Sequence, residues 1–462
     1  MSRPRGKDCT IGVDVGTTAV KAVAVDGRGA VVARARVPHG VGTPSADFLE
    51  HHADRAWRKG PRKAYAAVAA ELDGEAAAFE VTSMVPSITA VDRRGAPMLP
   101  GLLYGDARAR DDAASRGPED LGGERDEGRR MLEWAIAERP DARGYWPCQA
   151  VATYALSGVP AVDTATAASF GGLFVQNRWD PAALEVLGVG EDKLSRVVDM
   201  GRPAGTVPDS STLAGGGSVD AFCEQIVAGA NRPGDVLAIF GATLVVWVVS
   251  EEWIERPGLI SFPSTEPGQV LVGGASNAGA LFADWARSLL GGTRRRRPAV
   301  DEADERTGDP YRIPVWLPYL RGERTPFHDP MLRASIHGLD ITQGPEAMLR
   351  AAHEASGFVI RRIVERSGAS AKRIVATGGG SRSVPWMQAV ADASGLPVET
   401  VAVPEGAALG AAFMARMVAG LETDFSVAGS WARTGGTIDP DPTWAQAAAA
   451  RFARFEAIGP GT

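Results

Sequence analysis

Residues 11–26, IGVDVGTTAVKAVAVD, are the most informative stretch of this chain. Apolar residues at positions 11, 13 and 15 alternate with Gly12, Asp14 and Gly16, which predicts a strand, a polar Gly-Thr-Thr turn and a returning strand. An aspartate between two glycines is a poor core residue but suits a phosphate site, because glycine lets a polyphosphate approach the backbone. The stretch is therefore either a phosphate-binding hairpin or an ordinary hairpin, and its residues alone do not distinguish the two.

The groups around this turn are those that a bound phosphate and its metal ion need. The turn offers backbone N–H groups and the hydroxyls of Thr17 and Thr18, while Lys21 on the returning strand can reach a phosphate as a point charge. Asp14 can hold Mg2+, directly or through water. Together with Gly16, these residues are our candidate phosphate site.

A second stretch, residues 234–250 (GDVLAIFGATLVVWVVS), repeats the pattern of strand, Gly-x-Thr turn and strand. Its strands are apolar on both faces, which is typical of central strands in a covered sheet. A phosphate-binding hairpin in each half indicates a duplicated nucleotide-binding fold with ATP in the cleft between the halves. Two unrelated buried hairpins are the alternative.

Length and charge restrict the class of protein. At 462 residues the chain is too long for one hydrophobic core, so we expect two domains. Its 49 basic and 56 acidic side chains give a net charge of −7, which argues against a general nucleic-acid surface. The one basic run, at 294–297, is followed by acidic residues between 301 and 305 and is expected to be a self-neutralised loop.

The sequence gives no sign of export or membrane insertion. The N-terminus lacks the apolar segment of a signal peptide, and no stretch is long and apolar enough to span a bilayer. Cys9, Cys148 and Cys223 are scattered, which predicts a reducing compartment without a disulfide framework. We therefore expect a cytoplasmic protein. The pair His51 and His52 is expected at the surface.

The best candidate for a domain boundary is segment 201–217, which is rich in Gly, Pro and Ser. It divides the chain into domains of residues 1–208 and 209–462. Asp220 follows at the start of a predicted helix, where its carboxylate would either cap the helix or take part in catalysis. The Gly-rich loop before Asp220 could admit a substrate.

Other polar residues also have two interpretations. Asp106 and Arg108 follow a strand end, where open α/β sheets bind ligands, although a local salt bridge is the alternative. For Glu323 and Arg324, a loop-fixing ion pair is favoured over ligand contact. The further elements we expect are a strand at 29–37, helices at 64–71, 131–139, 147–156, 345–365 and 405–415, and a strand, Gly-rich turn and helix over 373–396.

The order of these segments resembles that of the FGGY family of carbohydrate kinases. The motifs that carry the resemblance are IGVDVGTTAVKAVAVD, GDARAR, GGGSVDAF, LPYLRGERTP, ASIHGLDITQGPEAMLRAAHEASGF, TGGGSRSVPWMQAVADASGLPV and EGAALGAA. The resemblance covers nearly the whole chain, and the order of its motifs is hard to obtain by chance. The resemblance implies an α/β fold of two actin/ribonuclease-H-like domains with a hinge and an interdomain cleft for ATP and sugar. It also implies ATP-dependent phosphorylation of a hydroxyl of a sugar or polyol.

The family's functional residues carry over to matching positions. Asp220 matches the catalytic base, and Asp106 and Arg108 match a substrate-side Asp-x-Arg motif. The phosphate and adenosine motifs are matched by Asp14, Gly16, Thr17, Thr18, Lys21, Gly241, Thr243, Gly378, Gly379, Gly380 and Ser381. Phosphoryl transfer needs mainly positioning and charge neutralisation, which Mg2+, Lys21 and backbone N–H groups can give. Asp220 would accept the hydroxyl proton.

The chain departs from the family at positions that bear on its substrate. Xylulose kinases carry Gln-Met-His-Gly where this chain has MVPS at 84–87, so Met84 is expected at the substrate site but the histidine is missing. The second phosphate turn is Gly-Ala-Thr instead of Gly-Thr-Ser, with the hydroxyl kept at Thr243. We expect a ketopentose or related ketose as substrate. The alternatives are a degenerate relative that binds ATP and sugar without catalysis, and another ATPase of the same superfamily. The sequence leaves the oligomeric state open; a homodimer is the commonest closed assembly.

Overall fold

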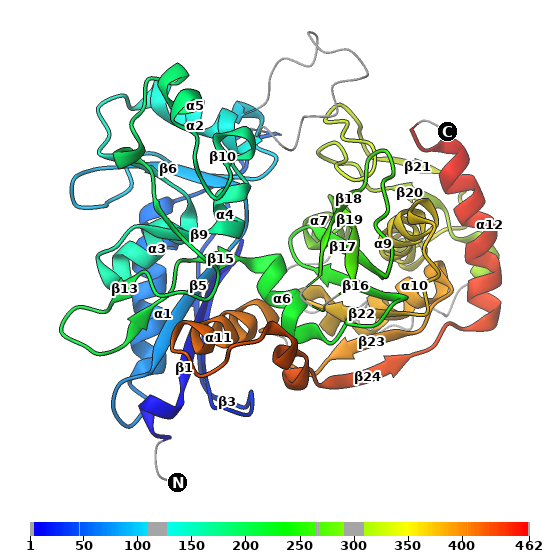
Figure 1. Ribbon diagram of the computed structural model, residues 1–462. Coiled ribbons are helices and arrows are strands. Elements are labelled where there is room, and N and C mark those ends of the chain that lie inside the picture. The colour runs from blue at the N-terminus through cyan, green and yellow to red at the C-terminus, as the bar shows by residue number, and fades with distance from the viewer. Residues whose placement is uncertain are drawn as a thin grey trace. The chain divides into compact units, whose positions relative to one another are not determined.

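The computed structural model describes residues 4–45, 47–109, 127–264, 266, 268–290, 309–403 and 405–460, which form two compact units (Figure 1). The first unit contains Met1–Val227 together with Glu405–Trp431, and the second contains Ala228–Pro404 together with Ala432–Thr462. The basic run at 294–297 lies outside the described residues. Each unit is an α/β layer structure built on its own seven-stranded sheet.

The sheet of the first unit begins with the predicted hairpin. Its strand order is β13-β14-β5-β1-β2-β3, and β15 pairs with β5. The strands are β1 (Thr10–Val15), β2 (Ala19–Val25), β3 (Val31–Pro38), β5 (Ala78–Ser83), β13 (Gly205–Thr206), β14 (Leu213–Ala214) and β15 (Ser218–Val219). β2 pairs antiparallel with β1 and β3, whereas β5 runs parallel to β1 and β14.

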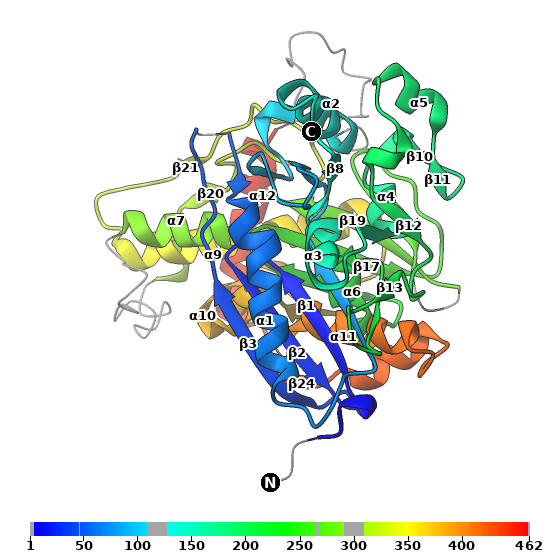
Figure 2. The same cartoon turned by 90° about the vertical axis from the view of Figure 1, so that its left-hand side faces the viewer.

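Helices cover this sheet and bury every residue of β1. α1 (Gly60–Ala69) packs against β2 and β3, in front of the blue strands in Figure 2. α11 (Gly406–Val418) packs against β1 and β5. A side-chain carbon at Gly12 would lie only 1.9 Å from the carbonyl oxygen of Ala408, and one at Gly410 only 1.7 Å from that of Cys223. The predicted small-residue helix is thus confirmed, and it lies on strands that are more than three hundred positions earlier in the chain.

A smaller sheet in the same unit has the order β4-β7-β6-β8. Its strands are β4 (Glu50–His51), β6 (Ser87–Val91), β7 (Gly101–Leu103) and β8 (Gly144–Trp146). The remaining helices are α2 (Glu127–Glu138), α3 (Cys148–Ser157), α4 (Thr164–Ala168), α5 (Pro181–Val186) and α6 (Asp220–Ala228). The remaining short strands are β9 (Ala161–Asp163), β10 (Phe174–Val175), β11 (Arg178–Trp179) and β12 (Arg196–Val198).

The second unit repeats the topology of the first. Its sheet has the order β18-β19-β17-β16-β22-β23-β24. The strands are β16 (Asp235–Phe240), β17 (Leu244–Ser250), β18 (Ile260–Pro263), β19 (Val270–Ser276), β22 (Arg373–Thr377), β23 (Val398–Val401) and β24 (Thr434–Ile438). β16 and β17 form an antiparallel hairpin, β22 runs parallel to β16 and β23, and β24 closes the edge antiparallel. Because β1, β2, β5 and β14 pair in the same directions, the prediction of a duplicated α/β architecture is confirmed.

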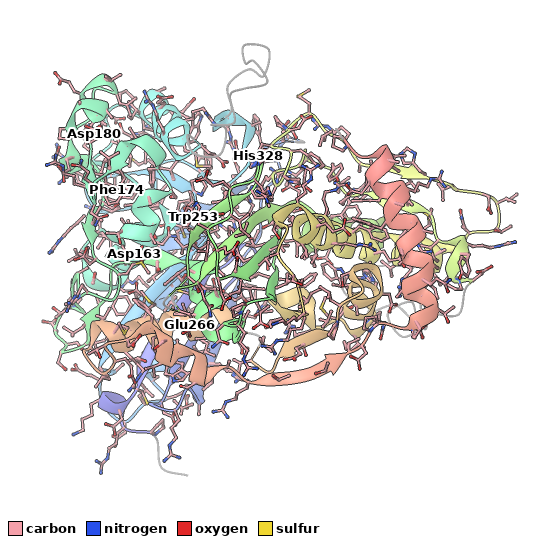
Figure 3. The ribbon with its side chains drawn as sticks, turned by 45° about the vertical axis from the view of Figure 1, so that its right-hand side comes forward. Asp163, Phe174, Asp180, Trp253, Glu266 and His328 are labelled. Carbon is pink, nitrogen blue, oxygen red and sulfur yellow. The ribbon has the colours of Figure 1, made fainter. Side chains whose placement is uncertain are left out.

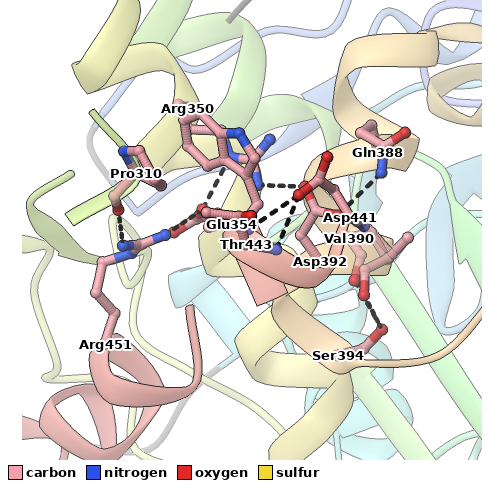
Figure 4. A network of polar contacts seen from close by, with 12 residues as sticks. Pro310, Arg350, Glu354, Gln388, Val390, Asp392, Ser394, Asp441, Thr443 and Arg451 are labelled. Atoms are coloured by element: carbon pink, nitrogen blue, oxygen red, sulfur yellow. Dashed lines mark hydrogen bonds and ion pairs between the residues drawn. The ribbon is translucent and has the colours of Figure 1, made fainter. Parts of the chain in front are cut away.

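A buried ionic network ties together three helices of the second unit, α9 (Pro345–Ser367), α10 (Val384–Ser394) and α12 (Pro442–Ile458) (Figure 4). This unit also contains α7 (Ala280–Leu289). Arg350 donates hydrogen bonds to Glu354 at 2.8 Å and to Asp392 at 2.7 Å, and Arg451 donates to both oxygens of Glu354 at 2.7 Å. Removing one partner would leave a buried charge unpaired, so the network fixes α12 to α9 and α10.

The first unit extends past the expected boundary at residue 208 to Val227. The Gly- and Pro-rich segment 201–217 contains β13 and β14, which pair within the first sheet and make the segment part of a unit. Local composition suggested a linker, but these turns connect paired strands. The three cysteines are buried and free. In the described part of the chain, no helix combines the length and apolarity of a membrane span.

Candidate functional site

The first hairpin places a buried carboxylate beside a lysine. Asp14 and Lys21 are partners in the β1–β2 register, and their side chains form an ion pair at 3.2 Å. The charge of Asp14 outweighs burial and raises the pKa of Lys21, so this ammonium group stays protonated. Asp14 is only 4% exposed. The hairpin therefore holds a negative charge on Asp14 and a positive charge on Lys21 side by side.

The glycines of the two hairpin turns are not required by the packing of the chain itself. A side-chain carbon at Gly16 would meet nothing closer than 3.4 Å, and one at Gly241 nothing closer than 3.5 Å. Their absent side chains leave space beside Asp14 in the first turn and beside Thr243 in the second. In the first turn, the carboxylate of Asp14 and the backbone N–H groups beside this space are the groups that a phosphate with a hydrated Mg2+ needs.

His51 holds the first turn from behind, and its predicted surface position is wrong. The side chain is fully buried, with 0% exposure. The indole N–H of Trp57 donates to Nδ1 of His51 at 2.9 Å, so Nε2 carries the proton and donates to the carbonyl oxygen of Thr17 at 2.8 Å. Burial lowers the pKa of His51 to about 4. The adjacent His52 is exposed, as expected.

Asp220 opens α6 at the end of the loop that follows β14. One carboxylate oxygen accepts a hydrogen bond from the N–H of Ala221 at 2.7 Å. A helix cap normally binds the second or third N–H of the helix, so the contact to the adjacent residue is not typical capping geometry. Desolvation, followed by the negative charge of Asp14, raises the pKa of Asp220 to about 6. Because Asp14 and Lys21 both act on this pKa, the three residues share one electrostatic environment.

Asp106 and Arg108 form a fixed pair in this structure. Asp106 has 0% exposure. Its oxygens accept hydrogen bonds from Nε of Arg108 at 2.9 Å, from Nη2 of Arg108 at 2.8 Å and from the N–H of Leu49 at 2.7 Å. Arg108 also pairs with Glu50 at 2.7 Å, and its side chain is 17% exposed. Of the two residues, Arg108 is therefore the one that a ligand can reach.

Met84, the remaining predicted substrate residue, is 3% exposed. Its thioether sulfur accepts a hydrogen bond from the hydroxyl of Ser83 at 3.1 Å. Gln149 on α3 donates to the carbonyl oxygen of Ser83 at 2.9 Å, so this end of β5 is held by neighbouring side chains. Met84 thus follows the last residue of β5. This end of β5 pairs with β15, the strand that directly precedes Asp220.

The second hairpin turn is held by the start of α7. The N–H groups of Ala280 and Leu281 donate to the carbonyl oxygens of Gly241 and Ala242 at 2.9 and 3.0 Å. A side-chain carbon at Gly279 would lie 2.2 Å from the backbone of Thr243, so α7 begins directly against the turn. With these carbonyl groups engaged, the turn can present its N–H groups to an anion.

The Gly-rich turn at 378–381 lies beside the same hairpin. Gly378 has φ +86°, and a side-chain carbon there would lie 2.8 Å from the carbonyl oxygen of Phe240, the last residue of β16. Gly380 is closely packed against Trp386, and the hydroxyl of Ser381 donates to the carbonyl oxygen of Gly378 at 2.8 Å. The predicted phosphate and adenosine residues of the second unit are therefore neighbours at the ends of β16 and β22.

Glu323 has the structural role that the sequence favoured. It is 3% exposed. Its carboxylate accepts hydrogen bonds from the hydroxyl of Ser276 at 2.8 Å and from the N–H groups of Asn277 at 3.0 Å and Arg324 at 2.7 Å. Desolvation raises its pKa to about 7. The residue fixes its loop to the end of β19.

Sequence reasoning missed two buried polar residues of the first unit, His51 and Glu80. Glu80 lies in β5 with 1% exposure, and desolvation followed by the charge of Asp163 raises its pKa to about 8. Figure 3 labels Asp163, at the end of β9. The available signal was weak: a lone charged residue, glutamate, in the strand AFEVTS. A charged residue inside a buried strand requires a partner and therefore indicates a long-range contact.

Comparisons with known proteins identify a family. The model of the FGGY family of carbohydrate kinases matches residues 9–115 with its N-terminal domain and 236–419 with its C-terminal domain. The chain is 23% identical to the gluconokinase of Bacillus licheniformis, covering 90% of this chain and 89% of the relative. It is 25% identical to the xylulose kinase of Escherichia coli K12, covering 89% and 90%. It shares the fold of the gluconate kinase of Lactobacillus acidophilus, with a TM-score of 0.81 at 22% identity over 97% of each chain.

Proposed function

The chain belongs to the FGGY family of carbohydrate kinases, and from this premise we propose that it transfers the terminal phosphoryl group of ATP to a hydroxyl of a neutral ketose, with ketopentoses as the first class. Carbohydrate kinase activity follows from the family. The acceptor and the roles of individual residues are the proposal. The observation that carries it is the shared environment of Asp14, Lys21 and Asp220.

Asp220 is the proposed general base. A base must be ionised before it can accept a proton, and a pKa of about 6 leaves Asp220 largely ionised at neutral pH while keeping it more basic than an exposed aspartate. Its carboxylate would accept the proton of the acceptor hydroxyl as that oxygen attacks phosphorus. The acceptor oxygen forms a bond to the terminal phosphorus as the bond from that phosphorus to the bridging oxygen of ADP breaks, so the products are a phosphate ester of the acceptor and ADP, with the proton on Asp220.

The two hairpin turns would bind the phosphates. Backbone N–H groups and the hydroxyls of Thr17, Thr18 and Thr243 would donate hydrogen bonds to the phosphate oxygens, while Lys21 contributes positive charge. When bound through Asp14, Mg2+ would neutralise charge on those oxygens. Gly378, Gly379, Gly380 and Ser381 in the second unit would receive the adenosine.

Charge around Arg108 favours a neutral acceptor over an acidic one. Its guanidinium already pairs with the carboxylates of Asp106 and Glu50. An aldonate would add a third carboxylate to one cation, whereas a ketose can accept a hydrogen bond without adding charge. Gluconate remains the second candidate acceptor, because gluconokinases are among the relatives at similar identity.

A coupled assay of ADP release with a panel of pentuloses, hexuloses, alditols, cyclitols and aldonates tests the proposal. We expect acceptor-dependent ADP formation, with the highest kcat/KM for a ketose and none with Asp220→Asn. A highest value for an aldonate would refute the preference for a neutral acceptor. ATP binding without turnover on any acceptor would instead support the degenerate relative.

A further inference from the structure

The loop before Asp220 is built around one buried carboxylate. Glu80 of β5 is 1% exposed, and its Oε1 accepts a hydrogen bond from the N–H of Gly217 at 2.6 Å. The same oxygen accepts from the N–H of Val81 at 3.2 Å. Three positions after Gly217 the chain reaches Asp220, so Glu80 acts on the backbone that leads directly into α6.

Side chains of the first unit fill the space beside the three glycines of this loop. A side-chain carbon at Gly215 would lie 1.9 Å from Oε2 of Glu80. One at Gly216 would lie 2.4 Å from the side chain of Val198, and Gly217 has φ +81° with Gln149 only 2.8 Å from such a carbon. The Gly-rich loop that the sequence suggested for substrate entry is therefore filled from within the unit.

The peptide of Gly217 is held from both sides. Its N–H donates to Glu80, and its carbonyl oxygen accepts from the N–H of Asp163 at 2.9 Å and from the hydroxyl of Thr166 at 3.0 Å. β15 then pairs with the end of β5, with Ser218 opposite Thr82. These contacts determine where the backbone enters α6.

We infer that Glu80 is a positioning residue for the proposed base Asp220, because its carboxyl oxygen fixes the Gly217 peptide and with it the start of α6. The inference rests on the proposed function in that Asp220 is taken as the base. Glu80 contacts the loop and acts only through it.

The contact needs an acceptor oxygen and no negative charge. Desolvation holds the pKa of Glu80 at about 8, so the neutral acid predominates at pH 7. Glutamine supplies the same acceptor oxygen in a side chain of the same size. Methionine fills a similar volume but offers only a weak acceptor. The variants Glu80→Gln and Glu80→Met therefore form a matched pair that differs in the hydrogen bond.

Steady-state kinetics on the best acceptor is the first measurement. We expect Glu80→Gln to keep a kcat close to that of the wild type, and Glu80→Met to lose about 10- to 100-fold in kcat, since small misplacements of catalytic groups have effects of that size. KM for ATP and the acid limb of the pH profile should stay the same in both, because the base is displaced and not replaced. Glu354→Gln, in the network of the other unit, is the control: it lowers the melting temperature without changing kcat.

Backbone hydrogen exchange is the second measurement and does not depend on activity. The peptide covering 215–220 should exchange faster in Glu80→Met than in the wild type or Glu80→Gln. If Glu80→Met does not fold, Glu80→Leu replaces it, since this variant also removes the oxygen that accepts from the N–H of Gly217 and should show the same loss of kcat with faster exchange.

The outcomes separate this inference from the proposed function. A folded Glu80→Met variant, or Glu80→Leu in its place, with wild-type kcat and wild-type exchange overturns the inference. Equal losses in Glu80→Gln and Glu80→Met also overturn it, because the acceptor oxygen would then be irrelevant. If the wild type phosphorylates no acceptor, the proposed function fails, and the exchange comparison still decides whether Glu80 fixes the loop.

Discussion

Replacing Asp220 with asparagine should raise stability and abolish catalysis together. The carboxylate has its pKa raised from 3.8 to about 6, chiefly by desolvation and then by Asp14. Two pKa units at about 1.36 kcal/mol each make the ionised form cost up to about 3 kcal/mol in the folded state. Partial exposure of Asp220 and the loss of about 0.3–1 kcal/mol of favourable charge at a helix N-terminus reduce the gain to about 1–2 kcal/mol.

The gain depends on pH in a defined direction. Because the folded-state pKa is the higher one, the folded protein binds the proton more tightly, and ionisation removes stability as the pH rises from about 4 to about 6. The Asn variant should therefore melt higher than the wild type at pH 7.5 and equally near pH 4. A gain of 1–2 kcal/mol corresponds to roughly 2–8 °C for a unit of this size.

Activity should change in the opposite sense. Proton acceptance typically contributes about 100- to 10,000-fold, so kcat of Asp220→Asn should fall by that much while ATP binding persists. Asparagine caps helices as well as aspartate does, so a residue that only caps would tolerate the change. Turnover close to the wild-type rate would refute the base, and an unchanged melting temperature at pH 7.5 would refute the desolvation reasoning.

Three further substitutions test other parts of the first unit. Burial lowers the pKa of His51 to about 4 from the usual 6.5, so the stability of the protein should fall as the pH drops from 6.5 to about 4. The variant His51→Leu should remove this pH dependence in thermal melts. It should also raise KM for ATP, because the carbonyl group of Thr17 loses its hydrogen bond to His51. Arg108→Lys should raise KM for the acceptor far more than KM for ATP in steady-state kinetics, and equal effects would exclude Arg108 from the acceptor site. Gly12→Ala would force a carbon to within 1.9 Å of Ala408 and should prevent folding or cost more than about 3 kcal/mol, which circular dichroism would show; a normal melt would contradict the direct packing of α11 on β1.

Local patterns predicted the elements that depend on local sequence. Alternation around Asp14 and the apolar strands around Gly241 correctly gave both hairpins, and the apolar period of α9 gave that helix. The duplicated topology followed from them. These predictions succeeded because strand pairing in a hairpin and helix amphipathicity are set by residues close together in the chain.

The features that the sequence did not reveal depend on distant partners. His51 was expected at the surface, because nothing in its neighbourhood shows that Trp57 and the carbonyl group of Thr17 satisfy both ring nitrogens. The glycines of 215–217 were interpreted as part of a domain boundary, yet Gly215 lacks room for a side chain because Glu80 lies against it. A packing partner more than a hundred positions away does not affect the local hydrophobic periodicity from which burial is predicted.

The position of α11 in the first unit has a consequence for how the chain is made. The face of the first sheet on which α11 packs is covered only when Glu405–Trp431 has been synthesised, although the strands of that sheet are finished by Val227. At about 5–20 residues per second, the roughly two hundred intervening residues keep this apolar face uncovered for on the order of 10–40 s. During that interval a nascent chain carries an exposed patch that chaperones would recognise. Release of the polypeptide before residue 431 would leave a fragment prone to aggregation.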